Sequence, residues 1–332
     1  MRKVKWGVLS TAQIGMDKVL PAMQHSQWCE INAIASRSLD RAQTAAAKLG
    51  ISKAYGSYEE LLADPEIEAI YNPLPNDQHV PMTLAAARAG KHVLCEKPVA
   101  LTAKQAQELR AVAGKVHIME AFMVRFHPQW TQVRDRVRAG ELGDVRAVQA
   151  YFSYFNRDAS NIRNQVDIGG GALYDIGCYP IVIGRFLFGT EPKRVIALVD
   201  RDPEFKTDRT VSALLDFGDG RRLDFTISTQ SVPYQRVQVC GTHKRIEIQI
   251  PFNTPLGGET QVFTDDGTRL DGGSTTSETI AACNMYALQG DAFSRAVRGE
   301  IELPYGVEDA ILNMRVIDGL FASEKTNSWV DV

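Results

Sequence analysis

The sequence has few of the features that would place a protein outside a reducing compartment. Among its 332 residues are five cysteines, an odd number, widely scattered and never in a Cys-x-x-Cys pair. That usage disfavours both a disulfide framework and a structural zinc site. No apolar run approaches the roughly 18 residues that would cross a bilayer, and the segment after Met1 has no signal-peptide pattern. We therefore expect a cytoplasmic protein without a membrane partner.

An excess of charge of either sign is also missing. The 37 Lys and Arg residues nearly balance the 40 Asp and Glu residues, for a net charge of −3. A nucleic-acid partner is therefore not expected, because its phosphates demand a basic face. The six histidines show no HxH, HxxxH or HxxEH spacing, so no metal site is predicted. The length suggests about two domains.

The first third of the chain does contain an alternation of strand-like and helix-like segments. Buried-strand patterns occur at Val4–Leu9, Ile31–Ala35, Ala69–Asn72, His92–Cys95 and Val116–Met119. Helical patterns lie between them at Leu39–Leu49, Ser57–Ala63, Val80–Ala89 and Ala103–Val112. Ser57 with Glu60 and Thr102 with Gln105 resemble capping boxes. Strands joined by helices of this length predict an α/β fold with a doubly wound parallel sheet.

The pattern changes after residue 122. A helix is expected at Gln129–Ala139, an alternating strand at Val145–Tyr154 and a glycine-rich helical segment at Gly169–Phe188. Strand pairs with turns such as Asp219-Gly220 follow, and two helices, Met285–Val297 and Val307–Ala322, close the chain. We expect residues 1–122 to form a Rossmann domain and residues 123–332 an α+β domain with a large, mostly antiparallel sheet.

The first strand-to-helix turn carries an altered dinucleotide-binding pattern. Where the Rossmann fingerprint has G-x-G-x-x-G, this chain has Ser10, Ala12 and Gly15. Small residues there still allow a pyrophosphate to approach the backbone N–H groups at the helix start. An ordinary tight turn would also fit the pattern, but the flanking strand and helix favour dinucleotide binding.

The end of the second strand favours NADP(H) over NAD(H). NAD-binding domains usually place an acid there, about 20 residues after the turn, to accept from the ribose hydroxyls. This chain instead has Ser36 and Arg37, with Arg41 one helical turn further on. A serine can donate to a 2′-phosphate, and an arginine can bind it through two hydrogen bonds.

Three segments together resemble one family, the glucose–fructose oxidoreductase/inositol dehydrogenase (Gfo/Idh/MocA) proteins. They are Gly90–Ala100 (GKHVLCEKPVA), Asn72–His79 (NPLPNDQH) and Gly169–Pro180 (GGGALYDIGCYP). Tyrosine at position 179, where many members have histidine, and the segments Glu120–Pro128 and Asn161–Arg163 resemble one branch. That branch contains dimeric dihydrodiol dehydrogenases, NADP-dependent xylose dehydrogenases and glucose–fructose oxidoreductase. The resemblance implies the two-domain fold predicted above.

The resemblance also implies a set of site residues. Hydride transfer to or from a carbinol needs a group that carries the hydroxyl proton. Asp175 and Tyr179 are four residues apart and would share a helix face. Lys97, at the end of the fifth strand, would hold the substrate oxygen and lower the Tyr179 pKa. The implied catalytic residues are therefore Lys97, Tyr179 and Asp175, with Arg125 and Arg163 as further substrate contacts.

The predicted cofactor contacts come from the first strand-to-helix turn, from the end of the second strand and from the segments of the family resemblance. They are Ser10, Thr11, Ala12, Gln13, Ile14, Gly15, Ser36, Arg37, Arg41, Leu74, Pro75, Asn76, His79, Glu96 and Lys97. For His79 a structural role remains the alternative to a cofactor contact. The predicted activity is NADP(H)-dependent hydride transfer on a sugar, polyol or related diol, either as an aldose 1-dehydrogenase or as a keto-sugar reductase. A catalytically silent NADP-binding regulator of the same fold is the alternative.

We also expect a homo-oligomer, either a dimer or a dimer of dimers. Segments such as Leu223–Ile227 alternate apolar with polar residues, so the large sheet could have a second face that needs cover. The family resemblance similarly implies association through this sheet.

Overall fold

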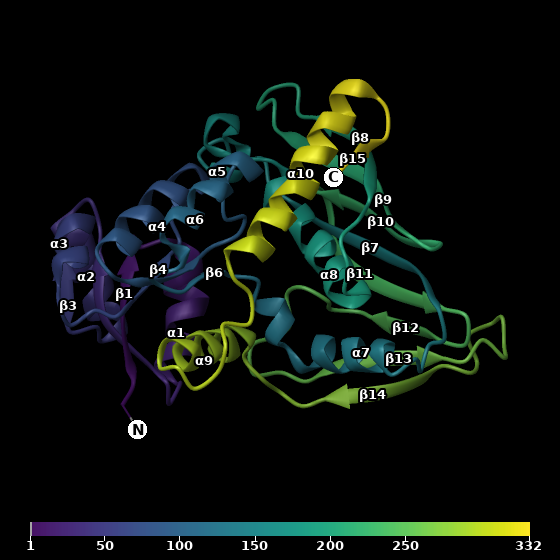
Figure 1. Ribbon diagram of the computed structural model, residues 1–332, viewed down its shortest axis with the longest axis horizontal. Coiled ribbons are helices and arrows are strands. Elements are labelled where there is room, and N and C mark those ends of the chain that lie inside the picture. Colours follow the sequence, from purple (N-terminus) through teal and green to yellow (C-terminus); the bar gives the residue numbers. More distant parts are fainter. Residues whose placement is uncertain (1) are drawn as a thin grey trace. The chain divides into compact units, whose positions relative to one another are not determined.

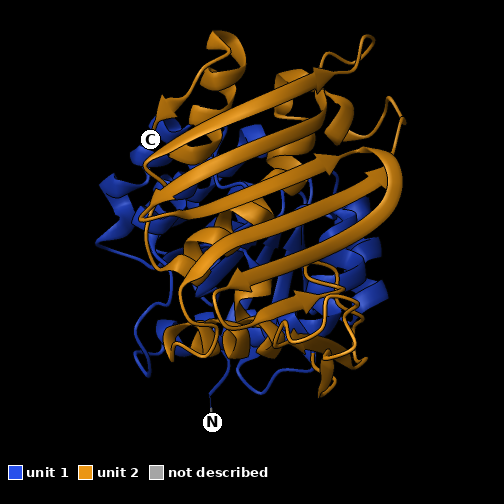
Figure 2. Cartoon of the chain, turned by 90° about the vertical axis from the view of Figure 1, so that its right-hand side faces the viewer, with its two compact units in different colours: residues 1–123, 284–314 blue, residues 124–283, 315–332 orange. Residues whose placement is uncertain are grey.

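A computed structural model describes residues 2–332 and contains two compact units (Figures 1 and 2). The first unit combines Met1–Met123 with Asn284–Met314, and the second combines Val124–Cys283 with Arg315–Val332. The chain thus leaves the first unit after Met123 and returns to it at Asn284 before it ends in the second.

The first unit is built on a six-stranded parallel sheet with the order β3-β2-β1-β4-β5-β6. Its strands are β1 (Val4–Leu9), β2 (Cys29–Ala35), β3 (Lys53–Tyr55), β4 (Ala69–Asn72), β5 (His92–Cys95) and β6 (Ile118–Glu120). Its helices are η1 (Gly15–Val19), α1 (Leu20–Gln24), α2 (Leu39–Leu49), α3 (Tyr58–Ala63), η2 (Asn76–Gln78), α4 (His79–Arg88), α5 (Ala103–Glu108), α6 (Arg110–Ala113) and α9 (Met285–Val297). This strand order confirms the predicted doubly wound sheet.

Local signals in the sequence account for several helix boundaries in this unit. Ser57 Oγ accepts from Glu60 N at 3.2 Å and Thr102 Oγ1 from Gln105 N at 3.1 Å, which confirms the first half of both capping boxes. In each box the glutamate or glutamine side chain accepts from the backbone N–H of the residue before the cap, as Glu60 Oε2 does from Gly56 N. The helix predicted at Ala103–Val112 is interrupted at Leu109, and the short strand β3 was not predicted.

The late helix α9 completes the core of the first unit. Trp6 of β1 is fully buried, donates from Nε1 to Ser294 Oγ at 3.1 Å and packs against the Phe293 ring at 5.3 Å between centroids. Burial of two aromatic rings with the indole N–H bonded is a strong packing anchor. The core of this unit therefore includes residues that lie nearly 290 positions apart in the sequence.

The second unit is built on a nine-stranded sheet with the order β14-β13-β12-β11-β7-β10-β9-β8-β15, seen as long orange arrows in Figure 2. The strands are β7 (Val145–Phe155), β8 (Arg194–Arg201), β9 (Asp208–Gly218), β10 (Arg221–Ser228), β11 (Gln230–Gly241), β12 (Arg245–Ile248), β13 (Thr260–Asp265), β14 (Thr276–Ile280) and β15 (Val330–Asp331). Only the β7–β10 pair is parallel among the described pairs. The large, mostly antiparallel sheet is confirmed.

The remaining helices are η3 (Met123–Phe126), α7 (Pro128–Arg138), η4 (Ile162–Asn164), η5 (Val166–Ile168), η6 (Leu173–Gly177), α8 (Cys178–Phe188) and α10 (Val307–Thr326), whose residues contribute to both units. Glycines let the η6–α8 segment lie close to β10. A Cβ at Gly177 would come within 2.8 Å of Ile227 Cδ1, and one at Gly184 within 2.9 Å of Leu223 Cδ2. The segment 166–188 is long and apolar enough to cross a membrane, but 83% of its most apolar window is buried. This segment therefore belongs to the core of the second unit.

Candidate functional site

The first strand-to-helix turn of the first unit has an unusual backbone at Ser10. This residue takes φ +80°, a region that L-residues other than Gly, Asn and Asp seldom adopt, and its hydroxyl accepts from Ala12 N at 3.2 Å. Gly15 opens the π-helical turn η1, where a Cβ would lie 3.4 Å from the Tyr71 ring. Strained backbone and π-helical turns occur preferentially at functional sites. Thr11, Gln13 and Ile14 complete this turn.

The end of β2 carries the residues predicted to select the cofactor. Ser36 is buried, and its Oγ accepts from Ser38 N at 3.4 Å. Arg37 and Arg41 are exposed, and the positive charge of Arg37 partly offsets the burial that raises the Tyr58 pKa. A hydroxyl and two solvent-accessible guanidinium groups at one sheet edge form a cationic surface suited to a phosphate.

His79 joins the two segments that follow β4 and β5. Its Nδ1 lies 2.7 Å from Pro98 O and its Nε2 lies 2.7 Å from Leu74 O. Burial lowers the His79 pKa, while the two carbonyl oxygens act in the opposite direction. Both ring nitrogens are thus occupied by backbone, and the imidazole positions the segments that contain Pro75 and Lys97.

Glu96 is held at the carboxyl end of β5, beside Lys97. The Tyr71 hydroxyl donates to Glu96 Oε1 at 2.7 Å, and Lys97 N donates to Glu96 Oε2 at 3.3 Å. On the other side of Lys97, Val99 N donates to the buried Glu120 carboxylate at 2.7 Å. The backbone around Lys97 is therefore fixed by two carboxylates, at the sheet edge where doubly wound domains bind ligands.

In the second unit, the three glycines before η6 permit close packing rather than continue the helix. Gly170 N donates to Gln165 O and Gly171 N to Arg163 O, both at 2.9 Å. A Cβ on Gly170 would lie 2.7 Å from those carbonyl oxygens, and one on Gly171, at φ +129°, would lie 2.0 Å from Asp208 Oδ1. The helix predicted to begin at Gly169 thus begins at Leu173, because the glycine backbone is used for contacts that a helix forbids.

A buried carboxylate occupies the start of that helix. Asp208 Oδ2 accepts from Leu173 N at 2.6 Å. Burial raises the pKa of Asp208 to about 7, although the bond from Leu173 N and the charge of Arg201 oppose that rise. The sequence did not mark Asp208, because its partner on η6 is 35 residues away.

Asp175, on η6, is part of a three-residue network. Its Oδ2 accepts from the Tyr154 hydroxyl at 2.6 Å and pairs with Arg163 Nε at 2.9 Å. The Asp175 side chain is 13% exposed. The structure therefore brings together two predicted site residues, Asp175 and Arg163, and adds Tyr154 of β7, which the sequence analysis did not select.

Tyr179 packs one turn further along, over the same strand. Its ring lies 6.0 Å from the Phe152 ring and 5.5 Å from the Phe252 ring between centroids, and 6% of the residue is exposed. Phe152 and Tyr154 are two residues apart on β7 and so share a face of the sheet. Asp175 and Tyr179 therefore lie against the same face of one strand.

The second unit has an open pocket of about 480 Å³, and its lining includes Phe152, which packs against Tyr179, and Tyr154, which bonds to Asp175. Its lining residues are Phe152, Ser153, Tyr154, Pro233, Tyr234, Gln235, Arg236, Gln249 and Asn253. The β7–β11 register shifts between Gln230 and Tyr234 beside it. A bulge at that point redirects side chains. Aromatic rings combined with amide and guanidinium groups suit a polyhydroxylated ligand.

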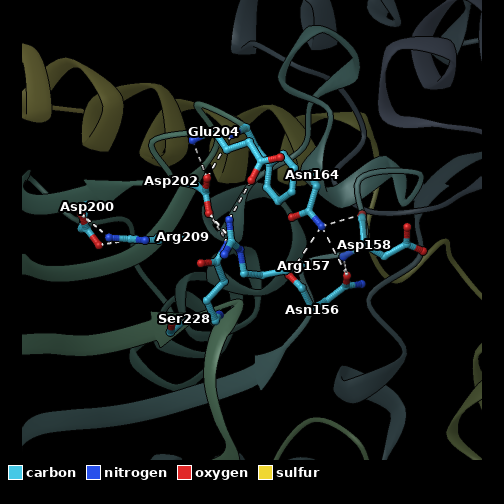
Figure 3. A network of polar contacts seen from close by, with 11 residues as sticks. Asn156, Arg157, Asp158, Asn164, Asp200, Asp202, Glu204, Arg209 and Ser228 are labelled. Atoms are coloured by element: carbon cyan, nitrogen blue, oxygen red, sulfur yellow. Dashed lines mark hydrogen bonds and ion pairs between the residues drawn. The ribbon is translucent and has the colours of Figure 1, made fainter.

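The loop that carries Arg163 is anchored by its neighbours. Figure 3 shows Asn164 pointing toward Asp158, whose carbonyl oxygen accepts from Asn164 Nδ2 at 2.9 Å. In the same view Arg157 points toward the fully buried Asp202 at 3.6 Å. Hydrogen bonds hold the pKa of Asp202 near 2 against its burial, so it stays ionised.

The other predicted site residues are placed as follows. Lys97 belongs to the first unit, and Tyr179 and Asp175 belong to the second. Arg125 lies in η3 and is 3% exposed. His127 Nδ1 accepts from Gln129 N at 3.2 Å, so His127 is the N-cap residue of α7.

These features define a class of protein. A doubly wound parallel sheet with a small-residue turn after β1 is a dinucleotide-binding fold, and the second unit adds a tyrosine and an ion-paired carboxylate beside a pocket. The class is that of two-domain, nucleotide-dependent oxidoreductases.

Comparison with known proteins specifies the family. Residues 4–125 match the model of the oxidoreductase family with an NAD-binding Rossmann fold, and residues 130–247 match the GFO/IDH/MocA C-terminal domain. The chain belongs to the Gfo/Idh/MocA family of oxidoreductases, as its three motifs predicted.

Named relatives lie in the expected branch. The chain is 39% identical to D-xylose 1-dehydrogenase (NADP(+)) 2 of Haloferax volcanii, over 98% of this chain and 99% of that one. It is 36% identical to mouse (Mus musculus) trans-1,2-dihydrobenzene-1,2-diol dehydrogenase, over 78% and 80% of the two chains. Its structure resembles that of KijD10, a 3-ketoreductase from Actinomadura kijaniata in complex with NADP and TDP-benzene, with a TM-score of 0.90, 29% identity and coverage of 97% and 98%.

Proposed function

We propose that the chain catalyses NADP(H)-dependent hydride transfer between the nicotinamide ring and a carbinol or carbonyl carbon of a sugar, polyol or related diol. The observation that carries this proposal is the arrangement of Asp175 and Tyr179 against one face of β7, next to the 480 Å³ pocket. A proton carrier and a hydrogen-bond acceptor beside a pocket are what carbinol oxidation requires.

The first unit would hold the cofactor. The Ser10–Gly15 turn would receive the pyrophosphate, and Ser36, Arg37 and Arg41 would bind the 2′-phosphate, because this edge offers a hydroxyl and exposed guanidinium groups. Asn76 and the backbone around Leu74 and Pro75 would line the nicotinamide side. When bound, NADP supplies the hydride acceptor or donor.

The second unit would hold the substrate and move its proton. The Tyr179 hydroxyl would carry the proton of the reacting carbinol, and Asp175 and Arg163 would bind substrate hydroxyls. Lys97 would hold the same substrate oxygen and, through its charge, favour the phenolate form of Tyr179. The family resemblance implies that Arg125 would be a further substrate contact.

An aldose oxidised at its anomeric carbon is the substrate class that fits best. The Haloferax volcanii relative is named as a xylose 1-dehydrogenase and covers nearly the whole chain. The pocket of about 480 Å³ has room for a monosaccharide. A trans-diol is the second class to assay, since the mouse relative is named for one.

A substrate panel tests the proposal. The purified protein is mixed with NADP+ and pentoses, hexoses or trans-diols, or with NADPH and keto-sugars, and the NADPH absorbance is followed. Turnover of at least one compound is expected. Tight NADPH binding without turnover of any of them would overturn the proposal and favour the silent regulator.

We further propose a cytoplasmic homo-oligomer associated through the second sheet. None of the five cysteines forms a disulfide within residues 2–332. Phe155, Leu198 and Val232 are 64%, 77% and 74% exposed on or beside the strands, and apolar groups at a sheet surface favour association. A monomer by light scattering at micromolar concentration would contradict the oligomer.

A further inference from the structure

Tyr154 makes a contact that the predicted reaction does not explain. Its hydroxyl donates to Asp175 Oδ2 at 2.6 Å, a short hydrogen bond, and Arg163 Nε reaches the same oxygen at 2.9 Å. Tyr154 also lines the pocket beside Asp175. One carboxylate oxygen therefore receives a phenol from β7 and a guanidinium group from η4.

The surroundings of both donors favour their protonated forms. Burial, together with the negative charge of Asp175, raises the Tyr154 pKa well above its ordinary value. The Asp175 charge likewise raises the pKa of Arg163. Hydrogen bonds from permanent donors favour the ionised form of a carboxylate. The charged and titratable groups described near Asp175 in this unit include Tyr154, Arg163 and, along its own helix, Cys178, whose Sγ lies 3.7 Å from Asp175 O, and Tyr179.

The backbone behind these donors is fixed. Arg163 O accepts from Gly171 N at 2.9 Å, so the loop of Arg163 and the turn that leads into η6 are bonded directly. Tyr154 lies on β7, which pairs on both sides with β10 and β11. The network thus connects three elements that are each held by backbone hydrogen bonds, which is the condition for a preorganised polar site.

We propose that Tyr154 is a positioning residue: with Arg163 it fixes the Asp175 carboxylate as a hydrogen-bond acceptor for a substrate hydroxyl, which makes Asp175 a substrate anchor rather than the proton carrier. The inference rests on the proposed function, since it assigns roles within the same site. It leaves the proton transfer to Tyr179.

The test uses Tyr154→Phe, which keeps the ring and removes only the hydroxyl. Tyr151→Phe is the matched control, because Tyr151 is on the same strand and its ring meets Tyr234 edge-on at 5.7 Å rather than contacting Asp175. We expect Tyr154→Phe to lower kcat/KM by about 10- to 100-fold, the worth of a hydrogen bond to a charged group, mainly through KM. The acid limb of the kcat/KM profile should move to higher pH, and NADPH affinity and the melting temperature should stay close to those of the unaltered protein.

A second measurement does not depend on turnover. The carboxyl carbon of Asp175 is titrated by NMR in the unaltered protein, Tyr154→Phe and Tyr151→Phe. The Asp175 midpoint should rise in Tyr154→Phe alone. An unchanged midpoint, or a loss of kcat/KM that is the same in both variants, would overturn the inference. Absence of turnover in the unaltered protein with every substrate would count against the proposed function, and the titration would still decide whether Tyr154 holds Asp175 ionised.

Discussion

Each unit contains a turn of small residues that leads into a π-helical turn, yet the two turns are built for different purposes. In the first unit, Ser10 closes the turn with a neutral hydroxyl that accepts from Ala12 N. In the second, the carboxylate of Asp208 accepts from Leu173 N at the start of η6. A helix start favours an acceptor or an anion because its N–H groups point outward.

This comparison shows that a glycine-rich segment before a helix does not by itself indicate a ligand-binding site. At Gly171 the space that a Cβ would fill is taken by Asp208, at 2.0 Å. A Cβ at Gly15 would lie 3.4 Å from the Tyr71 ring and 3.8 Å from Pro73, which is ordinary van der Waals contact. The second turn thus has its acid within the chain, and we propose that the first receives its anion from the cofactor.

The largest expected effects concern turnover, beginning with the proposed proton carrier of the second unit. Tyr179→Phe keeps the ring packing against Phe152 and Phe252 and removes only the hydroxyl, so turnover should fall by about 100- to 10,000-fold. NADPH affinity should scarcely change, because the proposed phosphate contacts lie in the first unit. Steady-state kinetics and NADPH fluorescence measure the two quantities.

Lys97→Met, in the first unit, tests the residue that we propose acts together with Tyr179. It should cost at least as much turnover, and the two losses should be far from additive, because we propose that both residues act on the same substrate oxygen. If Tyr179→Phe retains a third of the turnover when chemistry is rate-limiting, Tyr179 is a packing residue and the proton must be carried elsewhere.

The next effect is on stability and tests the turn of the second unit. Gly171→Ala should lower the free energy of unfolding by about 3 kcal/mol or more, since φ is +129° and the new methyl group would meet Asp208. Gly189→Ala is the matched control, with φ +64° and no atom within 4 Å. It should cost about 1 kcal/mol. Urea unfolding measures both, and equal losses would show that Asp208 does not fill the turn.

How far the sequence predicted this molecule differs between the units. In the first, local signals predicted most of the sheet: β1, β4 and β5 have the predicted bounds, and the proposed cofactor residues lie in the predicted turn and at predicted strand ends. In the second, the strands were expected but the network was not. Tyr154 meets Asp175 across 21 residues and Asp208 meets Leu173 across 35. Nothing local marks either partner, because such pairs depend on strand register and on where a helix begins.

Cofactor choice gives a smaller effect and is confined to the first unit. Arg37→Asp should weaken NADP+ binding by about 10- to 100-fold, the worth of a charge-assisted phosphate contact, and should turn the preference toward NAD+. Both cofactors are compared by kcat/KM with one substrate, and Arg88→Asp serves as an exposed control at the end of α4. Equal use of NADP+ and NAD+ by the unaltered protein would contradict the role of Arg37.

The smallest expected effect is a pH dependence of the free energy of unfolding, and it comes from a histidine of the second unit. His127, in the second unit, is 1% exposed, its Nδ1 accepts from Gln129 N, and its Nε2 has no hydrogen-bond partner within residues 2–332. Burial lowers the pKa of His127 to about 4, from 6.5. As the pH is lowered, His127 therefore takes up a proton at higher pH in the unfolded chain than in the folded protein. The contribution of neutral His127 to the free energy of unfolding is complete above pH 6.5 and declines as the pH falls toward 4.

That decline should be about 1 kcal/mol between pH 6.5 and pH 5.5, since one proton is involved. His127→Asn replaces the imidazole with an amide that can cap the same N–H of α7 but does not titrate. Urea unfolding of the unaltered protein and of His127→Asn across this range should give two curves that converge as the pH falls. His79 in the first unit is present in both proteins, so its own titration cancels in the difference. Parallel curves would mean that folding leaves the pKa of His127 unshifted, which would contradict the burial of a neutral imidazole at the start of α7.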